Sequence, residues 1–480
     1  MREATIVASL TSPSELESLP AEVRCLEVRT DLTGDVDPDW LRDRFRGELL
    51  YSLRSRAEGG ACESSGAERR ARLLAAARRW DLIDLEAGDL APEILGQIPA
   101  ERRALSWHGP AAGLGELRAR WERLAGTAAR LARLVPTAEE AAEALAPLRL
   151  LRELGRSDVV AFASGPAGWW SRLLALRLGA PFVFAAAGEE SGEPAVARLV
   201  GDYGLPALPP VEALYGILGR STAKSLSPRL HNAAYRSLGL PALYLPFLTQ
   251  SFGFFWGELA DGALADLGWP LRGLTVMAPY KESALAVVAR ASRMAQQAGA
   301  ANTLLRHDGS WSADTADAEG VLAALASRGV DVAGRRVAVV GCGGAGRAAA
   351  AGLQAAGAEV TLVNRGSERG QYASQLLGLP LVPLAEFDPR PFSLVVHATS
   401  LTEELPFAVS RLDQEAVVVE LVYGEAPTPL MTAAAGRGGI AIDGREILLV
   451  EVQRQFQMMT GRRMPAGPAR TLVGAPRRNS

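Results

Sequence analysis

The chain has little cysteine, almost no lysine and no long apolar run, and each scarcity excludes a class of protein. Cys25, Cys62 and Cys342 are its three cysteines in 480 residues, and their spacing fits neither a disulfide framework nor a metal site. Apolar stretches are broken by Gly, Pro or charge before they reach bilayer-spanning length, and the start MREATIVASL turns polar too soon for a signal peptide. A formal net charge of −3 gives no basic excess for nucleic acid or an anionic membrane. We expect a cytoplasmic protein with a small-molecule partner and no metal.

Lysine is represented by Lys224 and Lys281 alone, although lysine and arginine together number 51. A genome that favours Arg, Ala and Gly codons explains the general loss of lysine. A position that keeps lysine under that bias is expected to need a compact ammonium group, because the two side chains are not chemically interchangeable.

The first 205 residues alternate short apolar runs with helical stretches rich in Arg, Ala and Leu. Eight strands, each followed by a helical pattern, are the layout of a (β/α)8 barrel, with an open doubly wound sheet as the alternative. The sixth strand, ARLARL, fits a helix equally well. The predicted strands are 5–10, 25–31, 48–55, 81–86, 103–108, 129–134, 158–164 and 180–187.

The rest of the chain begins after GLPALPPVEAL (204–214), whose three prolines are typical of a linker. The amphipathic stretch 447–461 is predicted to pack back onto the α/β unit that begins near 214. The predicted parts are a barrel at 1–205, a substrate-binding domain at 213–320 completed by 424–465, a dinucleotide-binding domain at 321–423, and a disordered tail at 466–480.

A glycine-rich turn, GCGGAG, follows the buried strand VAVV and opens an Ala-rich helix. Gly341 makes the turn, Gly343 lets backbone approach a pyrophosphate, and Gly346 lets helix pack on strand. Gly344 lies at the helix start, where the positive end of the helix dipole favours phosphate. The strand–glycine–helix–strand order predicts a Rossmann domain that binds a nicotinamide dinucleotide.

The second strand of that domain, EVTLVN, ends at Asn364 and Arg365 without the Asp or Glu that binds the ribose hydroxyls of NAD. Arginine accommodates a 2′-phosphate, so Arg365, helped by Ser367 or Arg369, favours NADP. The alternative is a solvated arginine at a strand end.

Several polar clusters inside apolar sequence carry a family resemblance. KSLSPRLHN (224–232), MAPYKE (277–282), AANTL (300–304) and DTADAEG (314–320) precede the Rossmann turn, and VYGEAPTPL (422–430) and DGREILL (443–449) follow it. In this order the motifs resemble the shikimate dehydrogenases over about residues 213–465. The resemblance implies that Ser225 and Ser227 bind the substrate carboxylate and that Asn302 binds a ring hydroxyl. Alternatively, the two serines cap the helix that follows them.

Ketone reduction places negative charge on the carbonyl oxygen, where a cation or proton donor is needed. Lys281 follows a proline, and Asp317 lies near the connection into the Rossmann domain. We predict a catalytic Lys281–Asp317 pair, as the family resemblance also implies; the alternative for Lys281 is a surface charge.

The chain departs from the family pattern at three positions that border the substrate in the family fold. Met277 stands for Thr, Thr315-Ala316-Asp317 for Asn-Thr-Asp, and Glu451 for Gln. A carboxylate at Glu451 would weaken binding of an anionic acid unless it pairs or stays protonated.

The first half resembles the type I 3-dehydroquinate dehydratases in EVRTD (27–31), LRSRAEGG (53–60), SWH (106–108) and GWWSR (168–172). The resemblance implies a (β/α)8 barrel in which His108 is the general acid/base. It also implies that the substrate is bound by Glu27, Arg29, Arg54 and Arg172.

That family forms an imine on a lysine, and residues 1–223 contain none. The matching position at the end of the sixth strand is Arg133, and arginine stays protonated, so it is no amine nucleophile. Glu193 replaces the Gln expected in a late loop. We therefore predict a barrel without imine chemistry.

Together these features predict an NADP-dependent shikimate dehydrogenase with an appended dehydratase-like barrel. The alternatives are a bifunctional dehydratase/dehydrogenase that uses another route, a quinate-preferring dehydrogenase, and a metabolite sensor with weakened catalysis.

Overall fold

The computed structural model describes residues 4–188, 194–424, 426–465 and 469. The chain divides into two compact units, one of Met1–Ala213, Ser221–Ala223 and Leu245–Leu271, the other of Leu214–Arg220, Lys224–Tyr244 and Arg272–Ser480. Glu193 lies outside the described residues. The predicted disordered tail at 466–480 also lies outside them, apart from residue 469. None of the helices within these ranges is long and apolar enough to cross a membrane.

The first half is a parallel eight-stranded sheet with the order β7-β6-β5-β4-β3-β2-β1-β8. Neighbours in sequence are neighbours in space, and β8 returns to pair in parallel with β1. That return is typical of a barrel and not of an open doubly wound sheet, so the predicted fold class is confirmed. The strands are β1 (Thr5–Leu10), β2 (Val23–Arg29), β3 (Glu48–Ser52), β4 (Leu82–Glu86), β5 (Arg103–Gly109), β6 (Leu131–Pro136), β7 (Val159–Ala161) and β8 (Phe182–Ala186).

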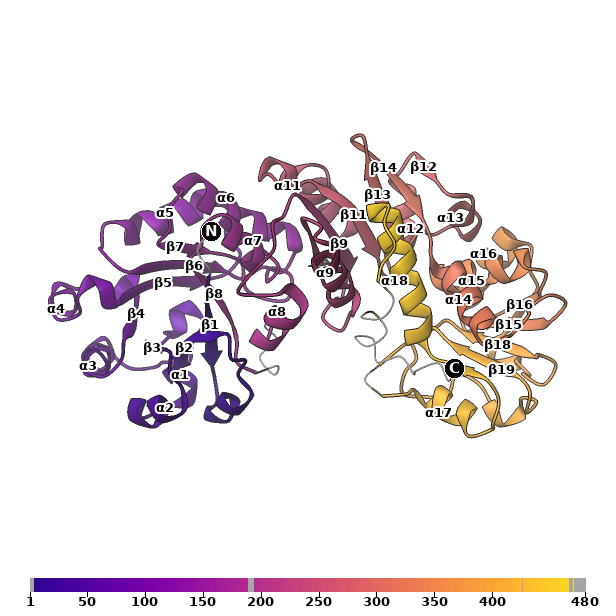
Figure 1. Cartoon of the computed structure of the whole chain (residues 1–480), viewed down its shortest axis with the longest axis horizontal. Coiled ribbons are helices and arrows are strands. Elements are labelled where there is room, and N and C mark those ends of the chain that lie inside the picture. The colour runs from indigo at the N-terminus through magenta and orange to yellow at the C-terminus, as the bar shows by residue number, and fades with distance from the viewer. Residues whose placement is uncertain (1–3, 189–193, 425, 466–468, 470–480) are drawn as a thin grey trace. The chain divides into compact units, whose positions relative to one another are not determined.

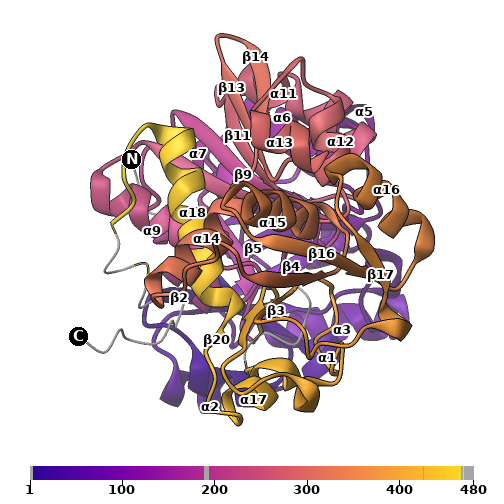
Figure 2. The ribbon, with the colours of Figure 1, turned by 90° about the vertical axis from the view of Figure 1, so that its right-hand side faces the viewer.

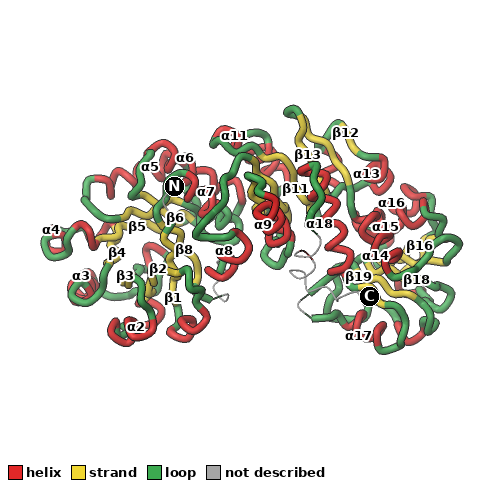
Figure 3. Tube along the Cα trace, viewed as in Figure 1, coloured by secondary structure: helices red, strands yellow, loops and turns green. Residues whose placement is uncertain are grey.

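Helices surround these strands (Figures 1 and 3). Amphipathic Ala/Leu/Arg stretches place apolar residues such as Leu73, Leu117 and Leu148 inward, where each is fully buried. The helices are α1 (Thr30–Thr33), α2 (Pro38–Arg44), α3 (Gly66–Ala76), α4 (Pro92–Leu95), α5 (Leu114–Ala125), α6 (Leu145–Leu154), α7 (Ser171–Arg177) and α8 (Val196–Tyr203).

Several strand boundaries in this half differ from the prediction: β2 covers Val23–Arg29 where 25–31 was predicted, and β7 covers Val159–Ala161 where 158–164 was predicted. ARLARL is a strand, as expected, but β6 begins at Leu131 and ends at Pro136. Arg133 is therefore its third residue and not its end. The difference arises because the apolar run continues through Leu134 and Val135, which are buried with the strand.

Residues 245–271, which we placed with the substrate-binding domain, cluster with the barrel residues. The ring of Phe247 lies 5.3 Å from that of Trp170, edge to face. The backbone N–H of Gln250 donates to Glu140 at 2.9 Å. These contacts attach the segment to the barrel side of the chain.

A six-stranded sheet with the order β10-β9-β11-β13-β14-β12 follows. Its strands are β9 (Ala213–Gly219), β10 (Ala242–Leu248), β11 (Leu271–Val276), β12 (Arg290–Ala291), β13 (Thr303–His307) and β14 (Ser310–Asp314). The accompanying helices are α9 (Ser227–Leu238), α10 (Phe252–Phe255), α11 (Ala263–Asp266), α12 (Lys281–Ala286) and α13 (Arg293–Ala298).

The last sheet is parallel and has the Rossmann order β17-β16-β15-β18-β19-β20. Alternate residues of β15 enter opposite cores, Val337 and Val339 on one face and Ala338 and Val340 on the other. Burial on both faces explains the continuous apolar run. The strands are β15 (Arg336–Val340), β16 (Glu359–Asn364), β17 (Leu381–Pro383), β18 (Leu394–His397), β19 (Val417–Glu420) and β20 (Ala441–Ile442), and the helices α14 (Asp317–Ser327), α15 (Gly344–Ala355), α16 (Ser367–Leu377), α17 (Pro429–Ala435) and α18 (Gly444–Thr460).

The long helix α18 returns to the middle sheet, as its amphipathic pattern predicted, and runs beside α14 (Figure 2). The hydroxyl of Tyr215 in β9 donates to the carbonyl of Met459 at 3.0 Å. The ring of Phe456 lies 5.4 Å from that of Tyr235 in α9. Residues of α18 therefore pack against β9 and α9, and α9 contains part of the predicted substrate motif at 224–232.

Candidate active site

Lys281 and Asp317 form a bidentate ion pair. Lys281 is the first residue of α12 and Asp317 the first of α14. The ammonium nitrogen lies 2.9 Å from Oδ1 and 2.8 Å from Oδ2 of the carboxylate. Both side chains are largely buried, that of Asp317 to 4 % exposure. An ammonium has three N–H donors, so a pair that engages two of them leaves a third for a ligand oxygen.

The carboxylate of Asp317 is held by its surroundings. The hydroxyl of Thr315 donates to its Oδ2 at 3.2 Å, and the first turn of a helix favours negative charge. Asn302 fixes the approach to α14, because its Oδ1 accepts from the backbone N–H of Ala316 at 3.0 Å and from the hydroxyl of Thr303 at 2.7 Å. The oxygen of Asn302 is thus committed to the protein, and its amide NH2 is the donor that a ring hydroxyl could use.

The glycine turn lies directly against Lys281. A Cβ atom placed on Gly344 would come within 3.1 Å of both Cβ and Cδ of Lys281 and within 3.0 Å of Cβ of Ala300. A side chain at this position would push Lys281 or Ala300 away by a few tenths of an ångström, so glycine gives the closest approach. The predicted cofactor turn and the predicted catalytic pair therefore belong to one site.

Glu451, on α18, joins this pair. Its carboxyl group is hydrogen bonded to Asp317 and interacts electrostatically with the ammonium group of Lys281. Burial and the neighbouring Asp317 raise its pKa to about 8, while Lys281 acts in the opposite direction. Glu451, predicted to stand for the Gln of the resembled family, is thus an acid whose neutral form is favoured at neutral pH.

Ser225 and Ser227 are buried at the start of α9. Ser225 accepts from the backbone N–H of Ser227 at 3.2 Å and is hydrogen bonded to Tyr423. Ser227 is hydrogen bonded to Tyr244, whose own hydroxyl donates to Thr275 at 2.7 Å. The cap residue of α9 is Leu226, without a side-chain cap. The helix-capping alternative therefore holds in part: Ser225 accepts from the first backbone N–H of α9, whereas Ser227 is itself the first residue of the helix.

Met277 closes the end of β9. A Cβ on Gly219 would lie 3.2 Å from its Cβ and 3.3 Å from its Sδ. The predicted substrate residue is thus an apolar side chain packed over a strand end and partly exposed.

The glycine turn has the shape that a pyrophosphate needs. Gly341 has a φ of +112°, and a Cβ there would lie 2.7 Å from the carbonyl oxygen of Ala398. A Cβ on Gly346 would lie 1.9 Å from the carbonyl oxygen of Gly341, whereas one on Gly343 would meet no atom within 4 Å. The backbone is therefore tight behind the turn and open in front of the helix start, and the residues present fit a dinucleotide.

Asn364 and Arg365 differ in role. Asn364 accepts from the backbone N–H of Cys342 at 3.1 Å and donates to the carbonyl of Gly366 at 2.7 Å, so it ties the turn to the end of β16. Arg365 is exposed. In the described part of the chain it makes no ion pair, and its guanidinium is available to an anion.

Arg133 is locked into the interior of the barrel. Its Nη2 lies 2.8 Å from Glu27 and 3.0 Å from Asp84, and its guanidinium lies 4.3 Å from the ring centre of Phe184. The four residues come from β2, β4, β6 and β8, which is how alternate strands build one layer of such a barrel. Arg133 and Arg54 lower the pKa of Glu27 to about 2 against the opposing effect of burial. Arg133, the predicted counterpart of the family's lysine, is thus a buried, doubly paired cation.

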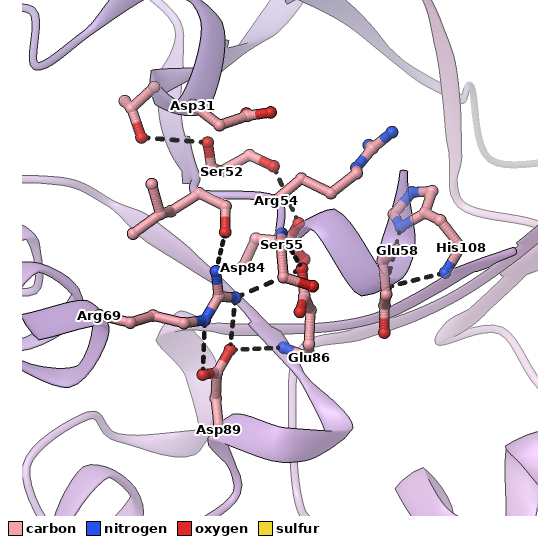
Figure 4. A network of polar contacts seen from close by, with 12 residues as sticks. Asp31, Ser52, Arg54, Ser55, Glu58, Arg69, Asp84, Glu86, Asp89 and His108 are labelled. Carbon is pink, nitrogen blue, oxygen red and sulfur yellow. Dashed lines mark hydrogen bonds and ion pairs between the residues drawn. The ribbon is translucent and has the colours of Figure 1, made fainter. Parts of the chain in front are cut away.

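His108 pairs with Glu58 (Figure 4). Glu58 accepts from the backbone N–H of His108 at 2.8 Å, and Nδ1 lies 3.3 Å away. Burial and the nearby Arg54 and Arg133 lower the pKa of His108 well below its usual value. Burial and Glu86 raise the pKa of Glu58 to about 8. The pair is therefore neutral around neutral pH.

Arg29 and Arg54 also act on the pKa of His108, and all the remaining predicted barrel residues are already engaged. Arg29 forms a two-point contact with Asp31 at 2.9 and 2.8 Å. Arg54 lies 3.9 Å from Glu27, and Arg172, in α7, donates to the carbonyl of Phe184 at 3.0 Å.

Three residues of these clusters were absent from the prediction. Glu58 stands in LRSRAEGG four positions after Arg54, and its signal was a second charged residue in a short motif. Asp84 is a charged residue inside the buried strand β4, where an inward carboxylate needs a cation. Tyr423 lay inside VYGEAPTPL, but nothing local indicates its contact with Ser225.

Three family models match the chain. The type I 3-dehydroquinase model matches residues 11–205, and the shikimate dehydrogenase substrate binding domain model matches residues 217–304. An FAD binding domain model matches residues 336–445. Flavin and nicotinamide enzymes share the strand–glycine turn–helix unit, so the third match agrees with a dinucleotide-binding Rossmann domain.

Some relatives match both halves of the chain and others match the second half alone. The bifunctional 3-dehydroquinate dehydratase/shikimate dehydrogenase of Arabidopsis thaliana is 27 % identical over 474 residues, which cover 91 % of this chain and 77 % of the relative. The shikimate dehydrogenase (NADP(+)) of Syntrophobacter fumaroxidans is 33 % identical over 264 residues, which cover 53 % of this chain and 90 % of the relative. A crystal structure of the Thermus thermophilus shikimate dehydrogenase with NADP(H) and shikimate is 32 % identical, with a TM-score of 0.50, and the match covers 55 % of this chain and 98 % of that one.

A Rossmann domain with a buried Lys–Asp pair against its glycine turn defines a dinucleotide-dependent oxidoreductase. With these relatives, the chain belongs to the shikimate dehydrogenase family, and its first half is a type I 3-dehydroquinase-like barrel.

Proposed function

We propose that the protein is an NADP-dependent shikimate dehydrogenase that interconverts 3-dehydroshikimate and shikimate in chorismate biosynthesis. The proposal is carried by the Lys281–Asp317 pair, which is buried against the cofactor turn at Gly344. Its parts are the predicted barrel at 1–205, the substrate-binding domain at 213–320 with 424–465, and the Rossmann domain at 321–423. Free Cys25, Cys62 and Cys342 fit the reduced cytoplasm in which we place it.

Lys281 supplies the proton donor for ketone reduction. Its free N–H hydrogen bonds to the carbonyl oxygen, stabilises the negative charge that develops there and passes a proton to that oxygen. Asp317 keeps the ammonium in place and accepts from the neighbouring hydroxyl of the substrate. Ser225 and Ser227 bind the carboxylate and Asn302 a ring hydroxyl.

The cofactor, when bound, supplies the hydride. Gly341, Gly343, Gly344 and Gly346 would hold its pyrophosphate, and Asn364 keeps the turn and β16 together. Arg365 would bind the 2′-phosphate, because no carboxylate stands at the end of β16 to accept from ribose hydroxyls.

We further propose that the barrel performs no imine chemistry. An imine needs an unprotonated amine, and Arg133 is a guanidinium paired with Glu27 and Asp84. The match of the Arabidopsis enzyme across both halves favours a second candidate, a bifunctional enzyme. Such an enzyme would have to use the neutral His108–Glu58 pair without a covalent intermediate.

Two measurements test these proposals. Shikimate with NADP should yield reduced cofactor, followed by absorbance, and should do so better than with NAD; no turnover with either cofactor would contradict the dehydrogenase proposal. Borohydride with dehydroquinate should leave the barrel unmodified. A mass increase on a residue of the first half would show that an imine forms there after all.

A further inference from the structure

Glu451 is fixed on both sides along α18. Towards the start of the helix, Glu446 pairs with Arg328 at the end of α14 at 2.7 Å. Towards its end, Arg454 pairs with Glu319 of α14 at 3.0 Å. Two ion pairs between the same two helices set the height of Glu451 relative to Asp317. Its carboxyl group is therefore held at the catalytic pair.

The packing leaves this carboxyl group little room to turn away. A Cβ on Gly320, one helical turn after Asp317, would lie 2.7 Å from Cγ and 3.2 Å from Oε1 of Glu451. Gly320 thus makes space for the Glu451 side chain where it passes α14. A larger residue at 320 would displace it.

The titratable groups around Glu451 come from every element packed on it. Asp317 of α14 is hydrogen bonded to it, Lys281 of α12 lies beside Asp317, and Tyr423 follows β19. Glu319 and Arg454 neutralise each other one turn away. An ionised carboxylate only accepts hydrogen bonds, so a bond between two carboxyl groups needs a proton on one of them.

We propose that Glu451 works as a neutral acid: it holds one proton against Asp317, and loss of that proton closes the site to a carboxylate-bearing substrate. This inference rests on the proposed function. With the proton in place, Lys281, Asp317 and Glu451 sum to zero charge. Without it they carry one negative charge, which repels the anionic shikimate. In its neutral form the acid has an O–H donor, as a glutamine amide has N–H donors.

The direction of the shift agrees with this role. Burial and Asp317 disfavour the ionised form, and the pKa of Glu451 rises to about 8, although Lys281 opposes the change. Substrate affinity should therefore fall as pH passes through the upper end of the physiological range, and neutral pH should keep the site open.

The test compares the wild type with Glu451→Gln, in which the amide cannot titrate. The ratio of kcat/KM for shikimate, wild type over variant, should stay constant from pH 6 to pH 7. It should then fall about fivefold between pH 8 and pH 9, as a single proton with a pKa near 8 is lost. The ratio removes the proton released by the reaction and every other pH effect that the two enzymes share. A ratio that stays flat to pH 9 would overturn the inference, and Glu359→Gln, at an exposed carboxylate of β16, is the matched control that should stay flat.

A second readout needs no activity. An acid whose pKa is raised in the folded state stabilises the fold less as pH rises from about 4.5 to about 8. The thermal midpoint of the wild type should therefore drop relative to that of Glu451→Gln over this window and run parallel to it above. If neither enzyme turns over shikimate but the thermal midpoints diverge in this way, the proposed function is wrong and the protonated state of Glu451 is still supported. Thermal midpoints that run parallel over the whole pH range would refute the protonated state of Glu451.

Discussion

At the scale of single residues, the site depends on a few charged side chains that other residue types cannot replace. Lys281 and Asp317 touch each other with both carboxylate oxygens engaged. Arg365, by contrast, is exposed at the end of a strand. The two positions should respond to substitution in different kinetic parameters.

Replacing Lys281 with Met removes the proton donor and keeps the length of the side chain. We expect kcat for shikimate oxidation to fall by about 10²–10⁴-fold, the range of general acid–base contributions. NADP affinity, measured by quenching of protein fluorescence, should change less than threefold, or about 0.7 kcal/mol. A loss of affinity as large as the loss of kcat would mean that Lys281 binds cofactor instead.

Replacing Arg365 with Ala tests the choice of cofactor. Hydrogen bonds to charged groups contribute about 1.5–3 kcal/mol, so KM for NADP should rise by about 10–100-fold. KM for NAD, which lacks the 2′-phosphate, should hardly move. Arg390→Ala, at an exposed arginine that pairs with Asp388, is the matched control, and equal effects of Arg365→Ala on the two cofactors would exclude a phosphate-binding role for Arg365.

At the scale of elements, the glycine turn separates fold from binding. Gly346 lies so close to the carbonyl of Gly341 that helix and strand meet there, while Gly343 borders open space and has an ordinary φ of −72°. Two Gly→Ala substitutions in one turn should therefore fail for different reasons.

Gly346→Ala should destabilise the Rossmann domain, because its Cβ would lie 1.9 Å from a carbonyl oxygen. A lowered thermal midpoint and reduced soluble yield are the expected results. Gly343→Ala should keep the wild-type midpoint within about 2 °C, equivalent to less than 1 kcal/mol, and lose NADP affinity. If Gly343→Ala bound NADP as well as the wild type, the pyrophosphate would have to lie elsewhere.

Sequence patterns located the elements well because the patterns are local. The eight barrel strands were found from apolar runs, although several of their limits differ by a few residues. The start of β6 at Leu131 is an example, and it lies where an arginine interrupts the run. The Lys281–Asp317 pair was predicted because each residue stands in a recognisable motif. Glu451 beside Asp317 and Arg133 between Glu27 and Asp84 were not predicted as contacts. These pairs meet only when distant elements pack, and no local periodicity encodes that.

At the scale of the whole molecule, the chain does not divide cleanly at the linker near 205–213. Residues 245–271 cluster with the barrel, and fully buried Phe247 and Phe255 lie within them. Trp170 of the barrel contributes to that burial through its contact with Phe247.

A fragment 214–480 should therefore be less stable than the full chain. It loses the contact of Trp170 with Phe247 and the Glu140 contacts of Gln250. Burial of one large apolar side chain contributes about 1.5–3 kcal/mol, so the fragment should unfold several degrees lower and tend to aggregate. Trp170→Ala in the full chain is the matched variant and should reproduce part of the loss. Equal thermal midpoints for fragment and full chain would show that the segment is self-sufficient.

Because lysine is scarce, an amine-reactive reagent meets only two lysine side chains, those of Lys224 and Lys281. Lys224 is exposed, whereas Lys281 is 16 % exposed and ion paired. An acylating reagent should mark Lys224 quickly and Lys281 slowly, because burial and the ion pair with Asp317 shield the Lys281 amine. The ratio of label on Lys281 to label on Lys224, measured in a digest, would then report how far the active site is occupied. Lys224 serves as the internal reference, so no engineered probe is needed.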